Sequence, residues 1–325
     1  MPHSAARVDH ERRHAGTDAM RYVLCLAVVV LHSLPRPEFG RPETWAFLTA
    51  TICRGAVPFF FVASGFYAPV QKHPSAQIVF RPLRRLLPAY AIWLVIYLVA
   101  DRLKTGHLHF SLATLATGGS GYHLWFLPAL GVALALVCGG TALVGSRATG
   151  LICLALALAG LMLDGYRNVF GLPELGGTRI LMAPLPVYIG ALIRRSHLNI
   201  TIPFAILAVL GCWIAIIAEE ELIGFVAKRY PESHNAVIAT FGLGVSLFLL
   251  SQALPRSDAI EKLARLGRIS LGVYALHLLI IINLAPILGQ QDVLRVLTIA
   301  AVTFTVATLV SVALARQRLT RPLVA

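Results

Sequence analysis

Long apolar runs recur along the whole chain and constrain its fold more than any other feature. An α-helix needs about 20 apolar residues to cross a membrane, and ten runs of suitable length occur among the 325 residues. We predict helices at residues 17–34, 44–70, 83–103, 123–144, 148–164, 179–194, 201–219, 236–253, 269–288 and 293–315. Because backbone polar groups in lipid must be satisfied within the segment itself, the predicted fold class is all-α. The sequence therefore predicts a polytopic bundle of about ten transmembrane helices.

The composition agrees with a membrane protein. Only 13% of the residues are charged, whereas soluble domains carry about a quarter. The longest connections, 104–122, 165–178 and 220–235, are too short to form a soluble domain, and the acidic run from Glu219 to Glu221 is interpreted as solvated. We therefore divide the chain into an N-terminal tail (1–16), one transmembrane domain (17–316) and a C-terminal tail (317–325).

The distribution of charge predicts which side the ends occupy. With ten spans, both ends of the chain lie on the same side of the membrane. That side carries 18 of the 28 Lys and Arg residues but only 5 of the 15 Asp and Glu residues. Cytoplasmic loops carry an excess of Lys and Arg, so both termini are predicted to be cytoplasmic. The same rule explains the net charge of +13 without a nucleic-acid partner. The first apolar run lacks a signal-peptide cleavage site and is expected to remain as an anchor.

The first helix carries two ionisable residues, Arg21 and His32, within an otherwise apolar run. Eleven helical residues make three full turns and about 20°, so the two side chains share one face about 16 Å apart. Taken alone, Arg21 is equally explained as an interfacial anchor and His32 as a histidine near a helix end. Ionisable residues inside spans normally face a cavity or a partner. The shared face favours a channel with a cation at its mouth and an imidazole, a good general base, deeper inside.

The second span places Arg54 near its middle, ahead of Pro58 and the small pair Ser64 and Gly65. A guanidinium at that depth needs a partner or water, so Arg54 is interpreted as a site residue. Pro58 removes a backbone hydrogen bond and predicts a kink. Ser64 and Gly65 predict either close packing of another helix or a position that lines a pore.

A basic cluster, Arg81, Arg84 and Arg85, precedes the third span. The positive-inside rule explains these arginines. They also lie on the same predicted side as Arg21, where guanidinium groups would bind the phosphates of an anionic ligand. Both interpretations stay open on the residues alone.

Histidines and a tryptophan mark two later spans. His123 and Trp125 are either interfacial anchors or the lining of a sugar pocket, and His277, alone in its span, is interpreted as a hydrogen-bonded structural residue. His107 and His109 have no third ligand at a familiar spacing, so no metal site is predicted. The five cysteines lie in or beside apolar runs without a CxxC motif, which indicates packing residues.

In this order, the motifs resemble the acyltransferase 3 family of bacterial membrane proteins. Its first helix carries Arg-x10-His, which Arg21 and His32 match, and its second carries a stretch like R-x-A-V-P-x-F-F-x-x-S-G-[FY], which residues 54–66 match. Three further stretches also look like family features: RPLRRLLPAY, HLWFLPAL and SLGVYALH. The family's Arg-x-x-Arg has Pro82 at its first position here, where Arg81 is a candidate replacement. The resemblance covers about residues 17–316.

The resemblance implies an O-acyltransferase in the inner membrane of a bacterium. Such an enzyme moves an acyl group, usually acetyl, from cytoplasmic acyl-CoA to a hydroxyl of a surface polysaccharide or lipid-linked glycan. Acyl-CoA is then a co-substrate, with no bound cofactor, and the partners are membrane lipid and the glycan acceptor. A second copy of the chain and polysaccharide-assembly proteins are left open as further partners.

The resemblance also assigns roles to residues. Arg21, Arg84 and Arg85 are expected to hold the CoA, and His32 to act as the general base or to accept the acyl group itself. Arg54 is expected to stabilise negative charge on the thioester oxygen. The remaining candidates, Ser64, His123 and Trp125, are expected to line the pore or the acceptor side.

Two other functions fit the sequence. A transporter of a glycan or small molecule would also need buried polar residues, but it would leave its substrate unmodified. Transporters often show repeated halves with matching broken helices, and no such repeat is evident here. A non-catalytic partner in polysaccharide assembly would not need His32, so replacement of that residue separates this function from acyl transfer.

Overall fold

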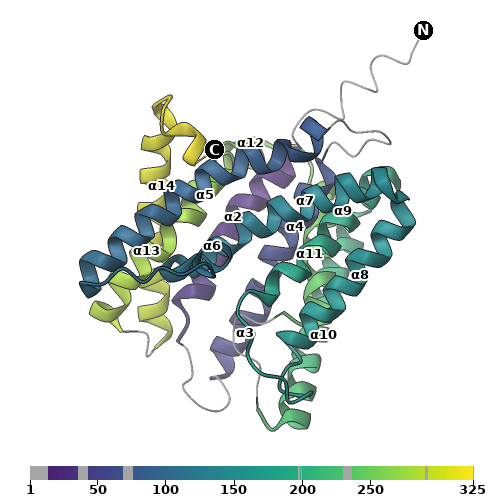
Figure 1. The fold of residues 1–325 in the computed structure, drawn as a ribbon, viewed down its shortest axis with the longest axis horizontal. Helices are drawn as coiled ribbons and strands as arrows, with labels where there is room; N and C mark the ends of the chain where they lie inside the picture. The colour runs from purple at the N-terminus through teal and green to yellow at the C-terminus, as the bar shows by residue number, and fades with distance from the viewer. Residues whose placement is uncertain are drawn as a thin grey trace.

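All regular secondary structure in the described part of the chain is helical, and this part contains no strand (Figure 1). The structure, a computed structural model, describes residues 14–35, 43–68, 76–196, 198, 200–229, 236–289 and 292–324. The main helices are α2 (Ala15–Ser33), α3 (Thr44–Cys53), α4 (Ala56–Phe66), α5 (Ala76–Thr105), α7 (Phe126–Leu143), α8 (Gly145–Leu163), α9 (Pro184–Ser196), α10 (Ile202–Ala227), α11 (Ile238–Ala253), α13 (Ser270–Leu288) and α14 (Val293–Arg316). The short elements are α6 (Thr114–Thr117), α12 (Asp258–Gly267), η1 (Gly119–Trp125), η2 (Thr178–Met182) and η3 (Arg321–Leu323).

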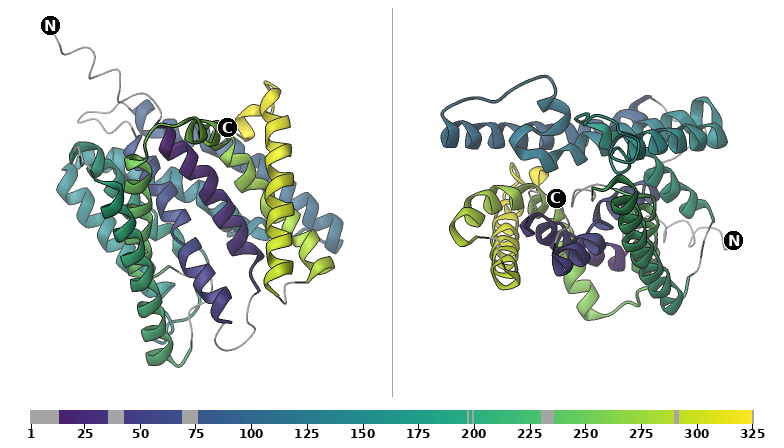
Figure 2. Two further views of the ribbon diagram at one scale, coloured as in Figure 1. Left: turned by 180° about the vertical axis from the view of Figure 1, so that it is seen from behind. Right: turned by 90° about the horizontal axis from the view of Figure 1, so that it is seen from below.

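The predicted all-α membrane bundle is confirmed. Within the described residues, eight helical segments are long and apolar enough to cross a membrane, with α3 and α4 counted together. The predicted spans 179–194 and 236–253 are also helical, but α9 has 13 residues and α11 has 16, fewer than a straight crossing needs. The start of α2 and the η3 turn lie at the same end of the bundle (Figure 2), while the side of the membrane that this end faces stays a prediction.

The second span is broken where the sequence predicts a kink. Helix α3 ends at Cys53, a turn follows at Arg54 and Gly55, and α4 begins at Ala56. Pro58 then lies in the first turn of α4, where a backbone N–H would have no partner within the helix. The break places Arg54 at a turn inside the bundle.

Two predicted boundaries and one interpretation are wrong. Helix α5 begins at Ala76, so the basic cluster lies on a helix, and α10 continues to Ala227, past the acidic run. That run is not simply solvated, because Glu220 is 1% exposed and forms an ion pair with Arg54. A helix tolerates these carboxylates inside the bundle because they have partners.

The helix α12 was not expected from the sequence. Its ten residues are too few for a span and lie in a predicted connection between 253 and 269. Its first turn is capped by Ser257, whose side chain accepts a hydrogen bond from the N–H of Ile260 at 3.3 Å. Gly267 at its end packs on α2, where an added Cβ would lie 1.9 Å from the carbonyl oxygen of Asp18.

Helices α4 and α9 pack closely through small residues. A Cβ added to Gly65 would lie 1.9 Å from the carbonyl oxygen of Val187, and one added to Gly190 would lie 2.0 Å from that of Val62. Such small residues let two backbones approach within a membrane. For Gly65 the structure therefore shows helix packing, one of the two predicted roles. This contact holds α4, and with it the Arg54 turn, in the middle of the bundle.

Candidate active site

Two cavities lie toward opposite ends of α2. We call the first the arginine cavity; it measures about 510 Å³ and lies near the start of α2. We call the second the histidine cavity; it measures about 100 Å³ and lies near the end of α2. Since α2 is one continuous helix, Arg21 in the first cavity and His32 in the second lie about 16 Å apart along its axis.

The arginine cavity is strongly cationic. Its lining residues include Arg21, Arg81, Arg85 and Arg268, and no described Asp or Glu lines it. Arg81 and Arg85 are one turn apart on α5 and so share a face, which supports Arg81 as the replacement for the missing family arginine. Arg84 is exposed and does not line the cavity. This cavity therefore suits an anion with several negative charges.

Arg21 has two neighbours within this cavity region. Its Nη1 donates to Oδ1 of Asp18 at 3.0 Å, and its guanidinium lies 5.8 Å from the ring centre of Tyr67. Asp18 is 5% exposed, so this ion pair is largely withdrawn from solvent. Ser64 also lines the arginine cavity, and its hydroxyl donates to the carbonyl oxygen of Phe60 at 2.7 Å. Ser64 therefore lines a cavity as expected, on the side of Arg21 and away from His123.

The histidine cavity brings together four of the predicted site residues. His32, Arg54, His123 and Trp125 all line it, although they come from α2, the α3–α4 turn and η1. The hydroxyl of Tyr122 forms a hydrogen bond with Nδ1 of His32 at 3.3 Å. This bond, together with the position of His32 on α2, restricts the direction in which the other ring nitrogen, Nε2, points.

Two further imidazoles lie behind His32. His123 is 2% exposed and His277 is fully buried. The ring centre of His277 lies 5.1 Å from that of His32 and 4.7 Å from that of His123. Nδ1 of His277 is hydrogen-bonded to the carbonyl oxygen of Tyr274. Within the described residues, these side chains do not form a group arranged to hold a metal ion.

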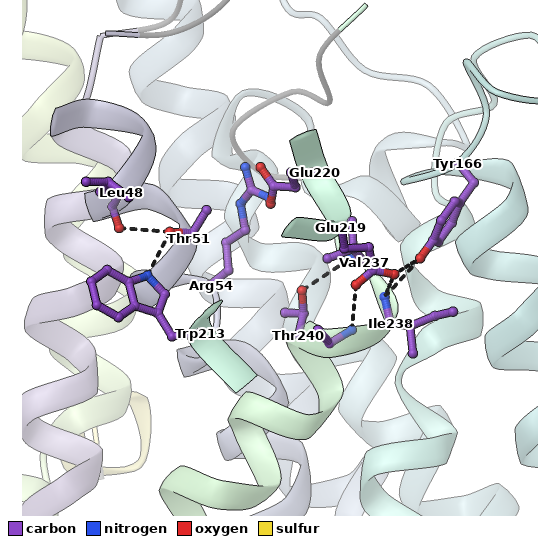
Figure 3. Close-up of polar contacts among 11 residues, drawn as sticks. Leu48, Thr51, Arg54, Tyr166, Trp213, Glu219, Glu220, Val237, Ile238 and Thr240 are labelled. Atoms are coloured by element: carbon purple, nitrogen blue, oxygen red, sulfur yellow. Dashed lines mark hydrogen bonds and ion pairs between the residues drawn. The ribbon is translucent and has the colours of Figure 1, made fainter. Parts of the chain in front are cut away.

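Arg54 is neutralised within the bundle by α10. The guanidinium forms an ion pair with Glu220, and both side chains are almost completely buried (Figure 3). The preceding residue, Glu219, accepts hydrogen bonds from the N–H groups of Ile238 at 3.0 Å and Ala239 at 2.9 Å, and from the hydroxyl of Tyr166. A carboxylate at a helix N-terminus stabilises the helix. The acidic run thus ties α10 to the Arg54 turn and to the start of α11.

The two cavities share a wall of two aromatic side chains. Phe126 and Tyr274 line both cavities, and their ring centres are 5.5 Å apart. The hydroxyl of Tyr274 donates to the carbonyl oxygen of His123, which holds its ring in place. These two rings therefore lie between the two cavities.

Comparison with known proteins identifies the family. The acyltransferase domain of the acyltransferase 3 family matches residues 14–316, nearly the whole chain. The chain belongs to the acyltransferase 3 family. It is therefore a membrane protein of an acyltransferase family, and the resemblance seen in the sequence is confirmed.

Two curated relatives of this acyltransferase 3 protein carry other names. A serine/alanine racemase of Enterococcus gallinarum is 29% identical over 297 residues, covering 82% of this chain and 40% of the relative. An amino-acid racemase of Enterococcus faecalis is 25% identical over 162 residues, covering 48% of this chain and 22% of the relative. The chain thus spans less than half of the length of either relative. No solved structure matches it.

The structure also adds neighbours to the predicted site of this acyltransferase 3 protein. Tyr122, Phe126 and Tyr274 were not singled out, and neither was Arg268, which precedes the SLGVYALH stretch. Phe126 and Tyr274 lie within the HLWFLPAL and SLGVYALH stretches, and Tyr122 and Arg268 lie just before them, which is the signal that could have suggested these residues. Glu220 gave no such signal, because nothing in the sequence relates an acidic run in α10 to a turn between α3 and α4.

Proposed function

We propose that this protein transfers an acetyl group from acetyl-CoA to a hydroxyl of a surface polysaccharide or lipid-linked glycan in a bacterial inner membrane. The observation that carries the proposal is the arrangement of α2, with Arg21 in a cationic cavity and His32 in a second cavity beyond two shared aromatic rings. This arrangement suits a donor with an anionic head and a reactive end on a long neutral arm.

The arginine cavity is proposed to hold the CoA phosphates. Arg21, Arg81, Arg85 and Arg268 supply charged donors for phosphate oxygens, and guanidinium groups bind such oxygens in pairs. The pantetheine arm then extends along α2, past Phe126 and Tyr274. The positive-inside rule supports a cytoplasmic position for this cavity, where acyl-CoA occurs.

His32 is proposed to handle the proton of the acceptor. The hydroxyl of the acceptor attacks the thioester carbonyl, its proton passes to His32, the C–O bond forms and the C–S bond breaks. The proton then passes to the CoA thiolate, which leaves as the thiol. A route in which His32 first accepts the acyl group is equally consistent with its position. Arg54 lines the same cavity and would stabilise charge on the carbonyl oxygen, although Glu220 offsets much of its own charge.

The names of the racemase relatives are not transferred to this chain. They describe proteins of more than twice this length, and only the matched membrane part is shared. Transport of a small molecule is the second candidate function, because cavities toward opposite ends of a membrane bundle also suit an alternating path. The two functions differ in one measurable product, an acylated acceptor.

The test uses inverted membrane vesicles supplied with acetyl-CoA labelled in the acetyl group. Label entering glycan or lipid-linked glycan is compared between the unaltered protein and His32→Ala at equal membrane levels. Loss of a general base is expected to lower the transfer rate about 10²- to 10⁴-fold. A control variant, His107→Ala, removes an exposed histidine of the connection after α5 and should leave the rate unchanged.

Three outcomes are informative. Transfer that requires His32 supports the proposal. Equal transfer by both proteins would mean that His32 is structural and that the site is wrongly assigned. If neither protein transfers label while the vesicles accumulate an unmodified substrate, the transporter is the better description.

A further inference from the structure

Three imidazole rings from separate segments meet at the buried side of the histidine cavity. His32 of α2 and His123 of η1 line the cavity, whereas His277 of α13 is fully buried and does not line it. His277 lies nearest to both, at 5.1 Å from His32 and 4.7 Å from His123 between ring centres. It therefore stands beside the residue to which the proposed function assigns proton transfer.

The ring of His277 has a defined tautomer when neutral. Its Nδ1 is bonded to the carbonyl oxygen of Tyr274, and a carbonyl oxygen can only accept, so Nδ1 carries the proton. The other nitrogen, Nε2, then keeps its lone pair, and it has no hydrogen-bond partner among the described residues. Buried acceptors are normally satisfied. A base with an unused lone pair beside His32 calls for a role other than packing.

Helix α13 is held in place around His277 by a side chain from α5. The hydroxyl of Tyr97 donates to the carbonyl oxygen of Ala275 and accepts from the N–H of Leu279, both at 2.9 Å. In an uninterrupted helix these two backbone groups would pair with each other. A side chain inserted into this pattern fixes the local shape of a helix, here two residues before and two residues after His277. Tyr97 is itself 1% exposed, so the arrangement is part of the bundle interior.

We propose that His277 is a positioning residue for His32 during acyl transfer, an inference that rests on the proposed function. When the acceptor hydroxyl attacks and the C–S bond of the thioester breaks, the hydroxyl proton passes to His32 and afterwards to the CoA thiolate. While His32 holds that proton its ring is cationic. The neutral ring of His277, with its free lone pair, orients the His32 ring and stabilises this charge.

Several other groups also surround His32. Arg54 and Arg179 line the same cavity, and their ion pairs with Glu220 and Asp164 offset much of their positive charge. Tyr122 bonds to Nδ1 of His32, and His123 lies 6.5 Å away between ring centres. Among the described residues that line the cavity there is no carboxylate that could offset the charge. His277 adds a neutral imidazole acceptor to these neighbours of His32.

The test compares three replacements of His277 in the purified full-length protein. His277→Phe keeps the volume of the ring, and His277→Asn keeps a hydrogen-bond donor near the position of Nδ1. Both variants remove the acceptor nitrogen Nε2. His277→Gln restores an acceptor near that position. The Phe and Asn variants are expected to lower kcat about 10- to 100-fold with an unchanged KM for acetyl-CoA. The Gln variant is expected to recover part of the lost kcat. The control His107→Phe should change neither constant.

A second measurement does not depend on acyl transfer. Diethyl pyrocarbonate modifies accessible neutral histidines, and mass spectrometry gives the rate at His32 relative to exposed His107 in the same sample. The relative rate at His32 is expected to change in the Phe and Asn variants and to return toward the original value in Gln. If the unaltered protein transfers no acyl group, the proposed function fails while these rates still decide the positioning role. Equal kcat and equal labelling of His32 in all variants would overturn the inference.

Discussion

At the scale of single residues, the decisive feature is the pairing of buried charges. A guanidinium at the Arg54 turn is compatible with a membrane interior because Glu220 from α10 neutralises it. Breaking a buried ion pair by removing one partner leaves an uncompensated charge, which is far more costly than losing an exposed pair. The pair therefore fixes α10 against the α3–α4 turn.

Replacement of Glu220 by Gln tests this pairing. We expect Glu220→Gln to lower the free energy of unfolding by about 3–5 kcal/mol, because Arg54 stays buried and charged. The readout is the thermal unfolding midpoint in detergent. The control Glu174→Gln removes a carboxylate whose side chain is 69% exposed and is paired with Arg167, so it should cost about 1 kcal/mol or less. Similar midpoints for the two variants would contradict the structural role of the pair.

The double variant Arg54→Met with Glu220→Leu separates structure from catalysis. Replacing both members of a buried pair by apolar residues of similar size is often neutral for stability. We expect the double variant to recover most of the unfolding midpoint lost in Glu220→Gln. If Arg54 also stabilises the thioester oxygen, acetyl transfer stays low in this stable protein. Full activity would remove Arg54 from the catalytic residues.

Neighbouring arginines of α5 provide a matched pair for donor binding. Both Arg84 and Arg85 are exposed, but Arg85 lines the arginine cavity and Arg84 does not. Loss of a charged hydrogen bond to phosphate costs about 1.5–3 kcal/mol, so Arg85→Gln should raise the KM for acetyl-CoA tenfold or more. Steady-state kinetics of Arg84→Gln should give a KM close to that of the unaltered protein. An equal rise in both variants would mean that the arginines act only through general surface charge.

At the scale of elements, close helix contacts position the site. Helix α4 carries the Arg54 turn at its start and packs on α9 where Gly65 and Gly190 leave no room for a side chain. Van der Waals packing between small residues replaces the hydrophobic effect as the force between helices in lipid. The position of the turn thus depends on two residues without side chains.

Adding one methyl group at this contact has a clear expected effect. Gly65→Ala places a Cβ 1.9 Å from a backbone oxygen of Val187, so helices must separate, and overpacking of this kind costs about 1–3 kcal/mol. The control is Gly211→Ala in α10, where nothing lies within 4 Å of the added atom. There Ala should be neutral or stabilising by up to about 1 kcal/mol. Size-exclusion profiles and unfolding midpoints in detergent distinguish the two outcomes, and equal behaviour would argue against the α4–α9 contact.

Much of the bundle could be predicted from the sequence because hydropathy and helix length are local properties. All ten predicted segments are helical, and the break before Pro58 follows from the chemistry of proline. The helix ends were less predictable, since α5 and α10 extend through polar residues that find partners elsewhere. The amphipathic α12 was missed because its ten residues carry no span-length signal.

The site was predictable only in part, for a related reason. Arg21 and His32 lie on one helix, so their shared face follows from helix geometry alone. Pairing between segments distant in sequence, such as Arg54 with Glu220 or Tyr97 with α13, leaves no local pattern. His277 illustrates the limit, because a single histidine in an apolar helix looks structural until its neighbours are known.

At the scale of the whole molecule, the last residues return to the wall of the arginine cavity. Pro322 lines that cavity, and the indole of Trp93 donates to the carbonyl oxygen of Leu323 at 3.0 Å. Val324 is fully buried, and its carbonyl oxygen accepts from the N–H of Gly272 at 3.2 Å. The η3 segment therefore connects α5 to the start of α13 at the cavity.

Charge introduced at this contact should disturb donor binding. Val324→Glu buries a carboxylate beside α13, and a buried unpaired charge is strongly unfavourable. We expect detachment of the η3 segment, a raised KM for acetyl-CoA and a lower unfolding midpoint. Leu319→Glu is the control, because Leu319 is 93% exposed. Unchanged kinetics in Val324→Glu would show that the segment contributes nothing to the cavity.

The shared wall of Phe126 and Tyr274 also has an electrical consequence. Where cavities enter a membrane from both sides, most of the voltage falls across the thin layer between them. A charge carried through such a layer works against about 2.3 kcal/mol per 100 mV. An acetyl group is neutral, and a proton that passes from acceptor to His32 to thiolate stays on one side of the rings. The rate of transfer should therefore be independent of membrane potential, unlike the flux of a carrier that moves a charged substrate.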